Sequence, residues 1–339
     1  MNVISKYDAC KKSVHQVAMD WSPVRRLRAL AKAALVLLLA VTAPAAPAVA
    51  EEAVQAAAAG ARKVVFAPYF ESYRPHDLRK VPSSAVTLAF LLGTPAKQLA
   101  WDGTMPLTEW RTRARASGKT IVLSFGGAAG SELASVQRDT VQLAEAYLAA
   151  ARMYGAKRLD FDIEGAGITD TDTVTRRNRA LRLVQNQLPG IALQYTLPVM
   201  PFGLDASCLA LLRDAKRCGV AIDTVNVMAM DYGGSFLGDM GKYALQAARA
   251  VRQQLVELGM PGVGVGITPM IGHNDVQGEV FTLEDARQVA EFAARTPWVD
   301  FVGFWAAGRD NGRKSTLGES SMLAQRDWDF TRTFAAKLG

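Results

Sequence analysis

Short runs of apolar, often β-branched residues alternate along the chain with longer segments in which apolar residues recur every three to four positions. The first pattern is typical of buried strands, and the second is typical of helices with one buried face. From residue 63 onward we expect eight strands, at residues 63–70, 85–92, 120–125, 158–164, 191–199, 224–230, 263–268 and 301–305. We expect helices at residues 141–153, 173–188, 207–216, 242–258, 283–295 and 328–337.

This regular alternation predicts a fold of the α/β class. Eight strand–helix units in roughly 280 residues match a (β/α)8 TIM barrel in number and in length. A doubly wound open sheet is the alternative, but its first strand usually leads into a glycine-rich phosphate-binding turn. The segment Phe66-Ala67-Pro68-Tyr69 does not resemble such a turn. We therefore expect a single barrel domain over residues 63–339, preceded by a short segment, residues 51–62.

The first fifty residues differ from the rest of the chain in charge and hydropathy. They hold seven Lys or Arg against two Asp, which is +5 of the formal net charge of +7. The basic stretch ends at Lys32 and leads into the largely apolar segment Ala33–Ala43, then into small residues and prolines up to Ala48-Val49-Ala50. This order predicts a signal peptide over residues 1–50, cleaved after Ala50, whether translation starts at Met1 or Met19.

The charge and length of these parts limit the function classes. An apolar segment of eleven residues is too short for a permanent membrane anchor, which needs about 20, so we expect a secreted or periplasmic protein. The +2 that remains gives no argument for a nucleic-acid partner. With three histidines in the chain, a histidine metal site or a histidine base is not expected. We expect a monomer that uses neither a cofactor nor a metal.

Three carboxylates occupy alternate positions of the expected fourth strand. Because strand side chains alternate between faces, Asp160, Asp162 and Glu164 project to one side of the sheet. In a barrel the apolar residues between them would face the helices, so the acidic residues would point inward. Glu164 would then lie at the carboxyl end, where barrel enzymes hold their catalytic residues. An alternating acidic triplet arises by chance often enough that the spacing alone is weak evidence.

The buried context of this acidic row, Asp160, Asp162 and Glu164, strengthens the functional interpretation. Carboxylates about 6.6 Å apart on a buried face repel one another unless they share a proton or a cation. A metal site would draw oxygen ligands from several strands to one point, whereas these three aim in parallel at different depths. Layered carboxylates can instead share a proton and keep the outermost one able to act as an acid. We favour acid catalysis over a divalent-cation site.

The acidic row resembles the Asp-x-Asp-x-Glu signature of family-18 glycoside hydrolases, the chitinases and their relatives. Three further segments resemble motifs of this family on the expected strands: Ser124-Phe125-Gly126-Gly127, Val225-Asn226-Val227-Met228-Ala229-Met230-Asp231-Tyr232-Gly233 and Phe304-Trp305. The second of these resembles the Met-x-Met-Asp-Tyr form of a prokaryotic branch. The matches follow the order of the family over residues 63–335.

The resemblance implies an exported glycosidase that hydrolyses β-1,4 bonds of chitin or N-acetylglucosamine oligomers. Glu164 would protonate the glycosidic oxygen. Asp162 would turn toward Glu164 and the acetamido N–H of the substrate, with Asp160 as its proton-sharing partner. The acetamido oxygen of the sugar, rather than an enzyme carboxylate, would attack the anomeric carbon. Retaining catalysis through an oxazolinium intermediate would follow.

The resemblance also implies a set of substrate contacts: Trp305, Asp231, Tyr232, Met228, Tyr195, Ser124, Gly126 and Gly127. Trp305 would stack on the sugar, Ser124 would bind Asp160, and the two glycines would clear space for the sugar. The commoner strand-six motif has Tyr where this chain has Met230, so Tyr232 or Tyr195 would supply the phenol. Ordinary structural roles, a helix cap, a tight turn and barrel filling, are the alternatives for these residues. Tyr69 and Trp101 are expected at the rim.

Two other functions fit the same barrel. A catalytically inactive chitin-binding lectin would usually lack the acidic residue at the position of Glu164, which this chain retains. An endo-β-N-acetylglucosaminidase would use the same residues on other glycans.

Overall fold

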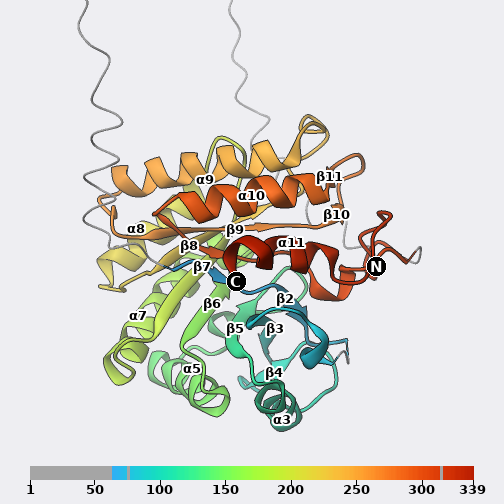
Figure 1. Cartoon of the computed structure of the whole chain (residues 1–339). Helices are drawn as coiled ribbons and strands as arrows, with labels where there is room; N and C mark the ends of the chain where they lie inside the picture. The colour runs from blue at the N-terminus through green and yellow to red at the C-terminus, as the bar shows by residue number, and fades with distance from the viewer. Residues whose placement is uncertain (1–62, 75–76, 314–315) are drawn as a thin grey trace, which may run out of the picture. The chain divides into compact units, whose positions relative to one another are not determined.

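The described residues form a closed barrel of parallel strands surrounded by helices (Figure 1). The structure is a computed structural model that describes residues 63–74, 77–313 and 316–339. These residues lie in one compact unit, Ala59–Gly339. The expected signal peptide, residues 1–50, and the segment 51–62 lie outside the described residues.

The main sheet has ten strands in the order β1-β12-β9-β8-β7-β6-β5-β3-β2, with β4 antiparallel to β3. Its strands are β1 (Val65–Phe66), β2 (Tyr69–Glu71), β3 (Ala85–Gly93), β4 (Leu99–Trp101), β5 (Thr120–Gly126), β6 (Arg158–Asp162), β7 (Ala192–Pro198), β8 (Thr224–Ala229), β9 (Gly264–Pro269) and β12 (Val299–Val302). A separate hairpin contains β10 (Gly272–His273) and β11 (Val280–Phe281).

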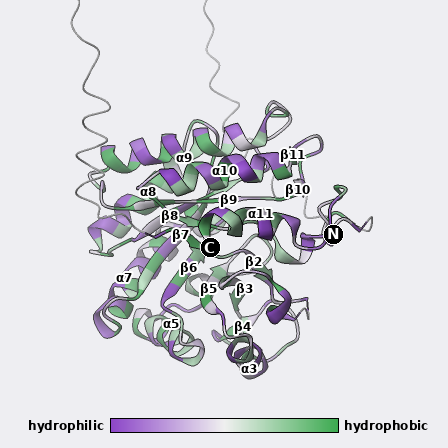
Figure 2. Cartoon of the chain, in the orientation of Figure 1, coloured by the Kyte–Doolittle hydropathy of each residue, from purple (hydrophilic) through white to green (hydrophobic). Residues whose placement is uncertain are grey.

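The described helices follow the strands along the chain. They are α3 (Leu107–Ser117), α4 (Leu133–Val136), α5 (Thr140–Tyr154), α6 (Ala166–Thr169), α7 (Thr171–Gln187), α8 (Ala206–Arg217), α9 (Met240–Glu257), α10 (Leu283–Arg295) and α11 (Asp329–Leu338), with 3-10 turns η1 (Leu78–Lys80) and η2 (Ala307–Arg309). Figure 2 shows hydrophilic and hydrophobic residues alternating along α9 and α10. This alternation is expected of helices that pack one face against a sheet.

Side chains and glycines define where several helices begin and end. The side chains that accept hydrogen bonds from the first N–H groups of α5, α7, α8, α9 and α10 are Asp139, Asp170, Asp205, Asp239 and Thr282. Such caps satisfy donors that have no partner within the helix. Helices α3 and α5 end at glycines in the left-handed conformation, Gly118 and Gly155, which glycine adopts without strain.

A proline divides the strand at which the barrel closes. β1 pairs in parallel with β12, and β2 pairs in parallel with β3. Pro68 lies between them and has no N–H to donate, but its carbonyl accepts a hydrogen bond from the N–H of Thr87 at 3.0 Å. β1 and β2 therefore count as one strand of the barrel. With the antiparallel β4 left out, the sheet is a barrel of eight parallel strands. The expected (β/α)8 barrel is confirmed.

The interior of the barrel has an apolar part and a polar part. The apolar part contains Ala67, Tyr69, Ala85, Ala89, Phe90, Val122 and Phe301. Strands β6 to β9 instead contribute buried polar side chains: Asp160, Asp162, Gln194, Thr196, Thr224, Asn226 and Thr268. Barrel interiors are usually filled by bulky apolar residues, so the polar part is where a site should be sought.

Candidate active site

Two carboxylates of the acidic row point into the barrel from β6, and the third follows the strand at its carboxyl end. Phe161, between Asp160 and Asp162, points the other way, because its ring packs edge-on against Tyr147 of α5 with centroids 5.1 Å apart. Asp160 is fully buried, Asp162 is 5% exposed and Glu164 is partly exposed. Exposure therefore increases along the row toward the mouth of the barrel.

The carboxylate of Asp160 accepts four hydrogen bonds, three from the neighbouring strands β5 and β7 and one from Tyr69 of β2. Tyr69 Oη donates to Oδ2 at 2.9 Å and Ser124 Oγ at 2.6 Å, while Gln194 Nε2 donates to Oδ1 at 3.0 Å and Thr196 Oγ1 at 2.6 Å. Burial raises the pKa of Asp160, and these four donors act in the opposite direction. The hydrogen bond from Ser124 that the family resemblance implied is present.

A second layer of polar groups holds these donors. Asn226 Nδ2 donates to Thr196 Oγ1 at 2.9 Å and to Tyr69 Oη at 3.2 Å, and Thr268 Oγ1 donates to Asn226 Oδ1 at 3.0 Å. A connected and buried network of this kind fixes the orientation of each member. Thr196, Asn226 and Thr268 were not among the expected site residues, although each is a polar position within an apolar strand of the sequence.

Asp162 has the opposite environment. Its Oδ1 atom is buried and, among the described residues, accepts no hydrogen bond. Burial raises its pKa well above the usual value, and the carboxylates of Glu164 and Asp160 raise the pKa further. A buried acceptor without a partner costs about 1–3 kcal/mol. Asp162 therefore favours its protonated form and any rotation that brings a donor to Oδ1.

Tyr69 lies inside the barrel rather than at the rim, where it was expected. Its side chain is 1% exposed. Burial, followed by the charges of Asp160 and Asp162, raises the pKa of the phenol well above its usual value, so the hydroxyl keeps its proton and donates to Asp160. The expectation for Trp101 was also wrong, because its indole is buried and donates to the hydroxyl of Tyr154 at 2.7 Å.

The glycines at the end of β5 were expected to make room for a sugar, but they make room for the protein itself. A Cβ on Gly126 would lie 2.1 Å from the carbonyl oxygen of Asp162, and a Cβ on Gly127 would lie 2.6 Å from the ring of Phe90. Both residues have positive φ, and the N–H of Gly127 donates to the Asp162 carbonyl at 2.9 Å. The glycine pair thus brings the backbones of β5 and β6 together beside the acidic row.

Trp305 forms an aromatic corner with two residues of the barrel interior. Its ring stacks on Phe90 with centroids 5.5 Å apart and planes at 15°, and its centroid lies 6.2 Å from that of Tyr69. The side chain is partly exposed. Since Tyr69 also binds Asp160, the indole surface lies near the base of the acidic row, where an apolar sugar face could stack on it.

The residues of the strand-six motif, which lie on and directly after β8, have different environments. Met228 is partly exposed at the carboxyl end of β8, and Asp231 has a φ of 52°. Asp231 Oδ1 accepts a hydrogen bond from the N–H of Val276 at 3.0 Å, which joins the loops after β8 and β9. Tyr232 packs edge-on against Tyr243 of α9, and its buried hydroxyl has no hydrogen-bond partner among the described residues.

The structure contradicts the expected contact of Tyr195 with substrate. Gln194 and Thr196, on either side of it in β7, both bind Asp160 inside the barrel. By alternation Tyr195 faces the helices, and its hydroxyl donates to Asn178 Oδ1 of α7 at 2.5 Å. Its phenol is therefore held on the outer face of the sheet.

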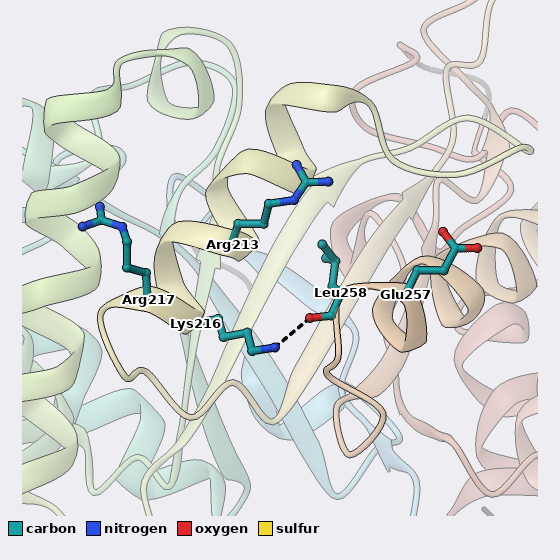
Figure 3. Close-up of a pocket in the computed structure, with 5 residues that line it drawn as sticks. All are labelled: Arg213, Lys216, Arg217, Glu257 and Leu258. Carbon is teal, nitrogen blue, oxygen red and sulfur yellow. Dashed lines mark hydrogen bonds between the residues drawn. The ribbon is translucent and has the colours of Figure 1, made fainter.

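A shallow cavity of about 500 Å³ lies away from the acidic row (Figure 3). It is lined by the carboxyl-terminal ends of α8 and α9, which lead into the amino ends of β8 and β9. Lys216 Nζ is bound to the Leu258 carbonyl there at 2.9 Å. Barrel enzymes place their chemistry at the carboxyl ends of the strands, so this cavity is not the candidate site.

Residues 63–74, 77–313 and 316–339 contain no group of three or more His, Cys, Asp or Glu side chains arranged to hold a metal ion. Within the same ranges, every helix is too short or too polar to cross a bilayer.

Two curated proteins with chitinase names are similar to this chain. The Probable bifunctional chitinase/lysozyme of Escherichia coli (strain K12) is 34% identical over 284 residues, which cover 73% of this chain and 31% of the relative. Endochitinase 11 of Metarhizium anisopliae is 37% identical over 215 residues, which cover 58% of this chain and 41% of the relative. The chain thus spans less than half of either relative.

A solved structure and a family model agree with these similarities. The catalytic domain of a hyperthermophilic chitinase from Pyrococcus furiosus superposes with a TM-score of 0.71 and 30% sequence identity, covering 81% of this chain and 96% of that one. The model of the glycosyl hydrolases family 18 matches residues 62–261. These residues include the acidic row and the strand-six motif, and the chain belongs to family 18 of the glycosyl hydrolases.

Proposed function

We propose that this protein hydrolyses β-1,4 bonds next to N-acetylglucosamine in chitin oligomers, with retention through an oxazolinium intermediate. The observation that carries the proposal is the contrast within the acidic row. Asp160 is held by four donors, whereas Asp162 has a buried oxygen without a donor and a raised pKa. An acetamido N–H near Asp162 would supply the missing hydrogen bond.

The roles of the three carboxylates follow from this contrast. Glu164, at the mouth, would protonate the leaving oxygen and later activate water. Asp162 would rotate toward the acetamido N–H and orient the acetamido oxygen for attack on the anomeric carbon. Asp160, fixed by its donors, would supply the negative charge against which Asp162 retains its proton. Trp305, stacked on Phe90, would support the apolar face of the sugar.

The test is the product formed from a chitin tetramer. Proton NMR recorded immediately after mixing should show the β anomer, a thiazoline mimic of the oxazolinium should inhibit strongly, and the fully deacetylated tetramer should remain uncleaved. An α anomer at the first time point would contradict retention. Equal cleavage of acetylated and deacetylated substrates would contradict participation of the acetamido group.

The same assay separates the other candidate functions. Binding of the tetramer without any cleavage would indicate a lectin, and cleavage only of other N-acetylglucosamine-containing glycans would indicate an endo-β-N-acetylglucosaminidase. A divalent-cation mechanism requires activity that is lost with a chelator. The oxygens of Asp160 already accept four hydrogen bonds from neutral donors, which argues against their use as metal ligands.

We also propose that the protein is exported, on the basis of the order of basic, apolar and small residues in the first fifty positions. Expression of the full chain in a bacterial host should give a mature protein whose amino terminus is Glu51. Recovery of uncleaved protein from the cytoplasm alone would contradict export.

A further inference from the structure

A buried ion pair joins the segment that follows β5 to helix α7. Glu132, just before α4, accepts a hydrogen bond from Arg177 Nε of α7 at 3.0 Å. The side chain of Arg177 is fully buried and that of Glu132 is 6% exposed. The proposed mechanism gives neither residue a role.

Both members of the Glu132–Arg177 pair make further hydrogen bonds. Glu132 Oε2 also accepts from the N–H of Ala134 at 3.0 Å, and Oε1 accepts from the hydroxyl of Tyr147. Arg177 Nη2 donates to the carbonyl of Gly167 at 3.3 Å. Burial lowers the pKa of Arg177, but the charge and the hydrogen bond of Glu132, together with Tyr195 and Tyr147, outweigh this effect, so the pKa is raised and the guanidinium stays charged.

The pair is linked to the backbone of the proposed acid by two hydrogen bonds that meet at Gly167. Gly167, whose carbonyl binds Arg177, donates its N–H to the carbonyl of Glu164 at 2.9 Å. The turn from Glu164 to Gly167 is therefore closed by its own hydrogen bond and held by Arg177 at Gly167. Arg177 is the side chain that connects this turn to Glu132.

The pair also borders the backbone of Asp162. A Cβ built on Gly126 would lie 3.6 Å from Glu132 Cγ and 2.1 Å from the Asp162 carbonyl oxygen. Glu132 thus packs beside the point where β5 contacts β6. One ion pair consequently lies beside the contact of Gly126 with the Asp162 carbonyl and is linked through Gly167 to the Glu164 carbonyl.

Stability alone is a weak reason for burying two charges here. Well-packed apolar residues often replace a buried ion pair without loss of stability, whereas removal of one partner costs about 3–5 kcal/mol. A planar guanidinium can bind two acceptors in fixed directions, which an apolar side chain cannot do. Here those acceptors are Glu132, which follows β5, and Gly167, in the short helix α6 that follows β6.

We propose that Arg177 and Glu132 are positioning residues that hold Glu164 at the distance from Asp162 needed for acid catalysis. This inference rests on the proposed function, because it takes Glu164 as the acid. A displacement of about 1 Å at a reacting group can lower the rate by about 10². It would also change the interaction between Glu164 and Asp162, and with it the pH dependence of the rate.

Two variants test the proposal in the full-length protein. Arg177→Lys keeps the positive charge but loses the planar guanidinium that binds two acceptors. The double variant Arg177→Met with Glu132→Gln removes both charges without leaving one unpaired. With the chitin tetramer as substrate, we expect kcat to fall at least about tenfold with KM within twofold of wild type. We also expect a displaced pH–rate profile in both variants.

Asp285→Asn is the matched control. Asp285 is also a buried carboxylate at the start of a helix, where it accepts hydrogen bonds from Thr282 and from the N–H of Gly241, but it lies on α10. This variant should lose stability while keeping kcat and the pH profile of the wild type.

Each outcome decides the proposal. Wild-type kcat and pH profile in a folded Arg177→Lys variant would overturn it, even if the double variant failed to fold. An equal loss of kcat in Asp285→Asn would assign the effect to stability and would also overturn it. If the wild type itself binds but does not cleave the tetramer, the proposed function fails, and the role of Arg177 fails with it.

Discussion

Glu164 and Asp160 are four positions apart, yet their surroundings differ. Glu164 is partly exposed at the end of β6, while Asp160 is fully buried and bound by four donors. Only the outer carboxyl can reach a glycosidic oxygen that enters from the mouth. In the proposed mechanism, the inner carboxyl acts on substrate through Asp162.

The first prediction concerns Glu164→Gln. The amide preserves the shape of the side chain but cannot donate a proton to the leaving oxygen, and general acid–base catalysis contributes about 10² to 10⁴ in rate. We expect kcat on the chitin tetramer to fall within that range, while calorimetry shows oligosaccharide binding within a few fold of wild type. Glu145→Gln, on the exposed face of α5, is the control and should keep full activity. Turnover of Glu164→Gln near the wild-type rate would remove Glu164 from the acid role.

Alternation along one strand was enough to predict that Asp160 and Asp162 share a face, because the period of a strand is fixed. It could not predict which donors reach them, since that depends on the register between neighbouring strands. Gln194 and Thr196 lie opposite Asp160 and Asp162 in β7. Alternation within β7 puts Tyr195 on the face opposite Gln194 and Thr196, so the expected contact of its phenol with substrate was wrong.

At the level of elements, the contact between β5 and β6 depends on a residue without a side chain. The carbonyl of Asp162 lies where the Cβ of any other residue at position 126 would be. The strand ends that carry Ser124 and Asp162 are therefore closer together than two ordinary residues would permit.

The second prediction is that Gly126→Ala separates these strand ends. The new methyl group would meet the Asp162 carbonyl at 2.1 Å, and φ at this position is +101°. We expect a loss of about 1–3 kcal/mol in the free energy of unfolding from backbone strain, measured by urea denaturation, together with a fall in kcat.

Gly155→Ala is the control, because it tests the cost of a positive φ without a steric clash against another strand. Gly155 also has positive φ, +64°, but nothing lies within 4 Å of its Cβ position. This variant should lose only about 1 kcal/mol and retain its activity. Equal effects of the two substitutions on kcat would show that the close approach of β5 to β6 does not matter for catalysis.

Most elements could be predicted from the sequence, with boundaries within three residues of those observed. Buried parallel strands are apolar on both faces, which makes them stand out. Helix α3 was missed because only two of its side chains, Trp110 and Ala114, are buried, too few to form an apolar stripe. The break at Pro68 was also missed, since the hydropathy of the strand continues through it.

At the level of the whole molecule, the buried carboxyl of Asp162 makes stability depend on pH. Its pKa is raised in the folded state, so the folded protein binds this proton more tightly than the unfolded chain does. The contribution to stability is therefore complete below the unfolded pKa of about 3.9. It is lost as the pH rises toward the folded pKa.

The third prediction follows from that sign. Asn does not titrate, so Asp162→Asn should gain stability relative to wild type as the pH rises from 4 to 8. The difference in Tm, variant minus wild type, should increase by roughly 2–4 °C for each kcal/mol involved. Differential scanning calorimetry at several pH values measures this difference, with the exposed Asp172→Asn as control. A difference that stayed constant or decreased would contradict the raised pKa.

The pairing of β1 with β12 and the packing of α11 on β1 determine where the two ends of the barrel domain lie. Helix α11 packs against β1, with the rings of Phe334 and Phe66 stacked at 5.5 Å. The strand begins, and the helix ends, at the face of the barrel opposite the acidic row. Modules fused before residue 63 or after Gly339 would therefore leave from the same side and keep the catalytic mouth open. This geometry suits a catalytic unit within longer, multi-domain polypeptides, and it makes a circular permutant with a short linker between the two ends a practical engineering target.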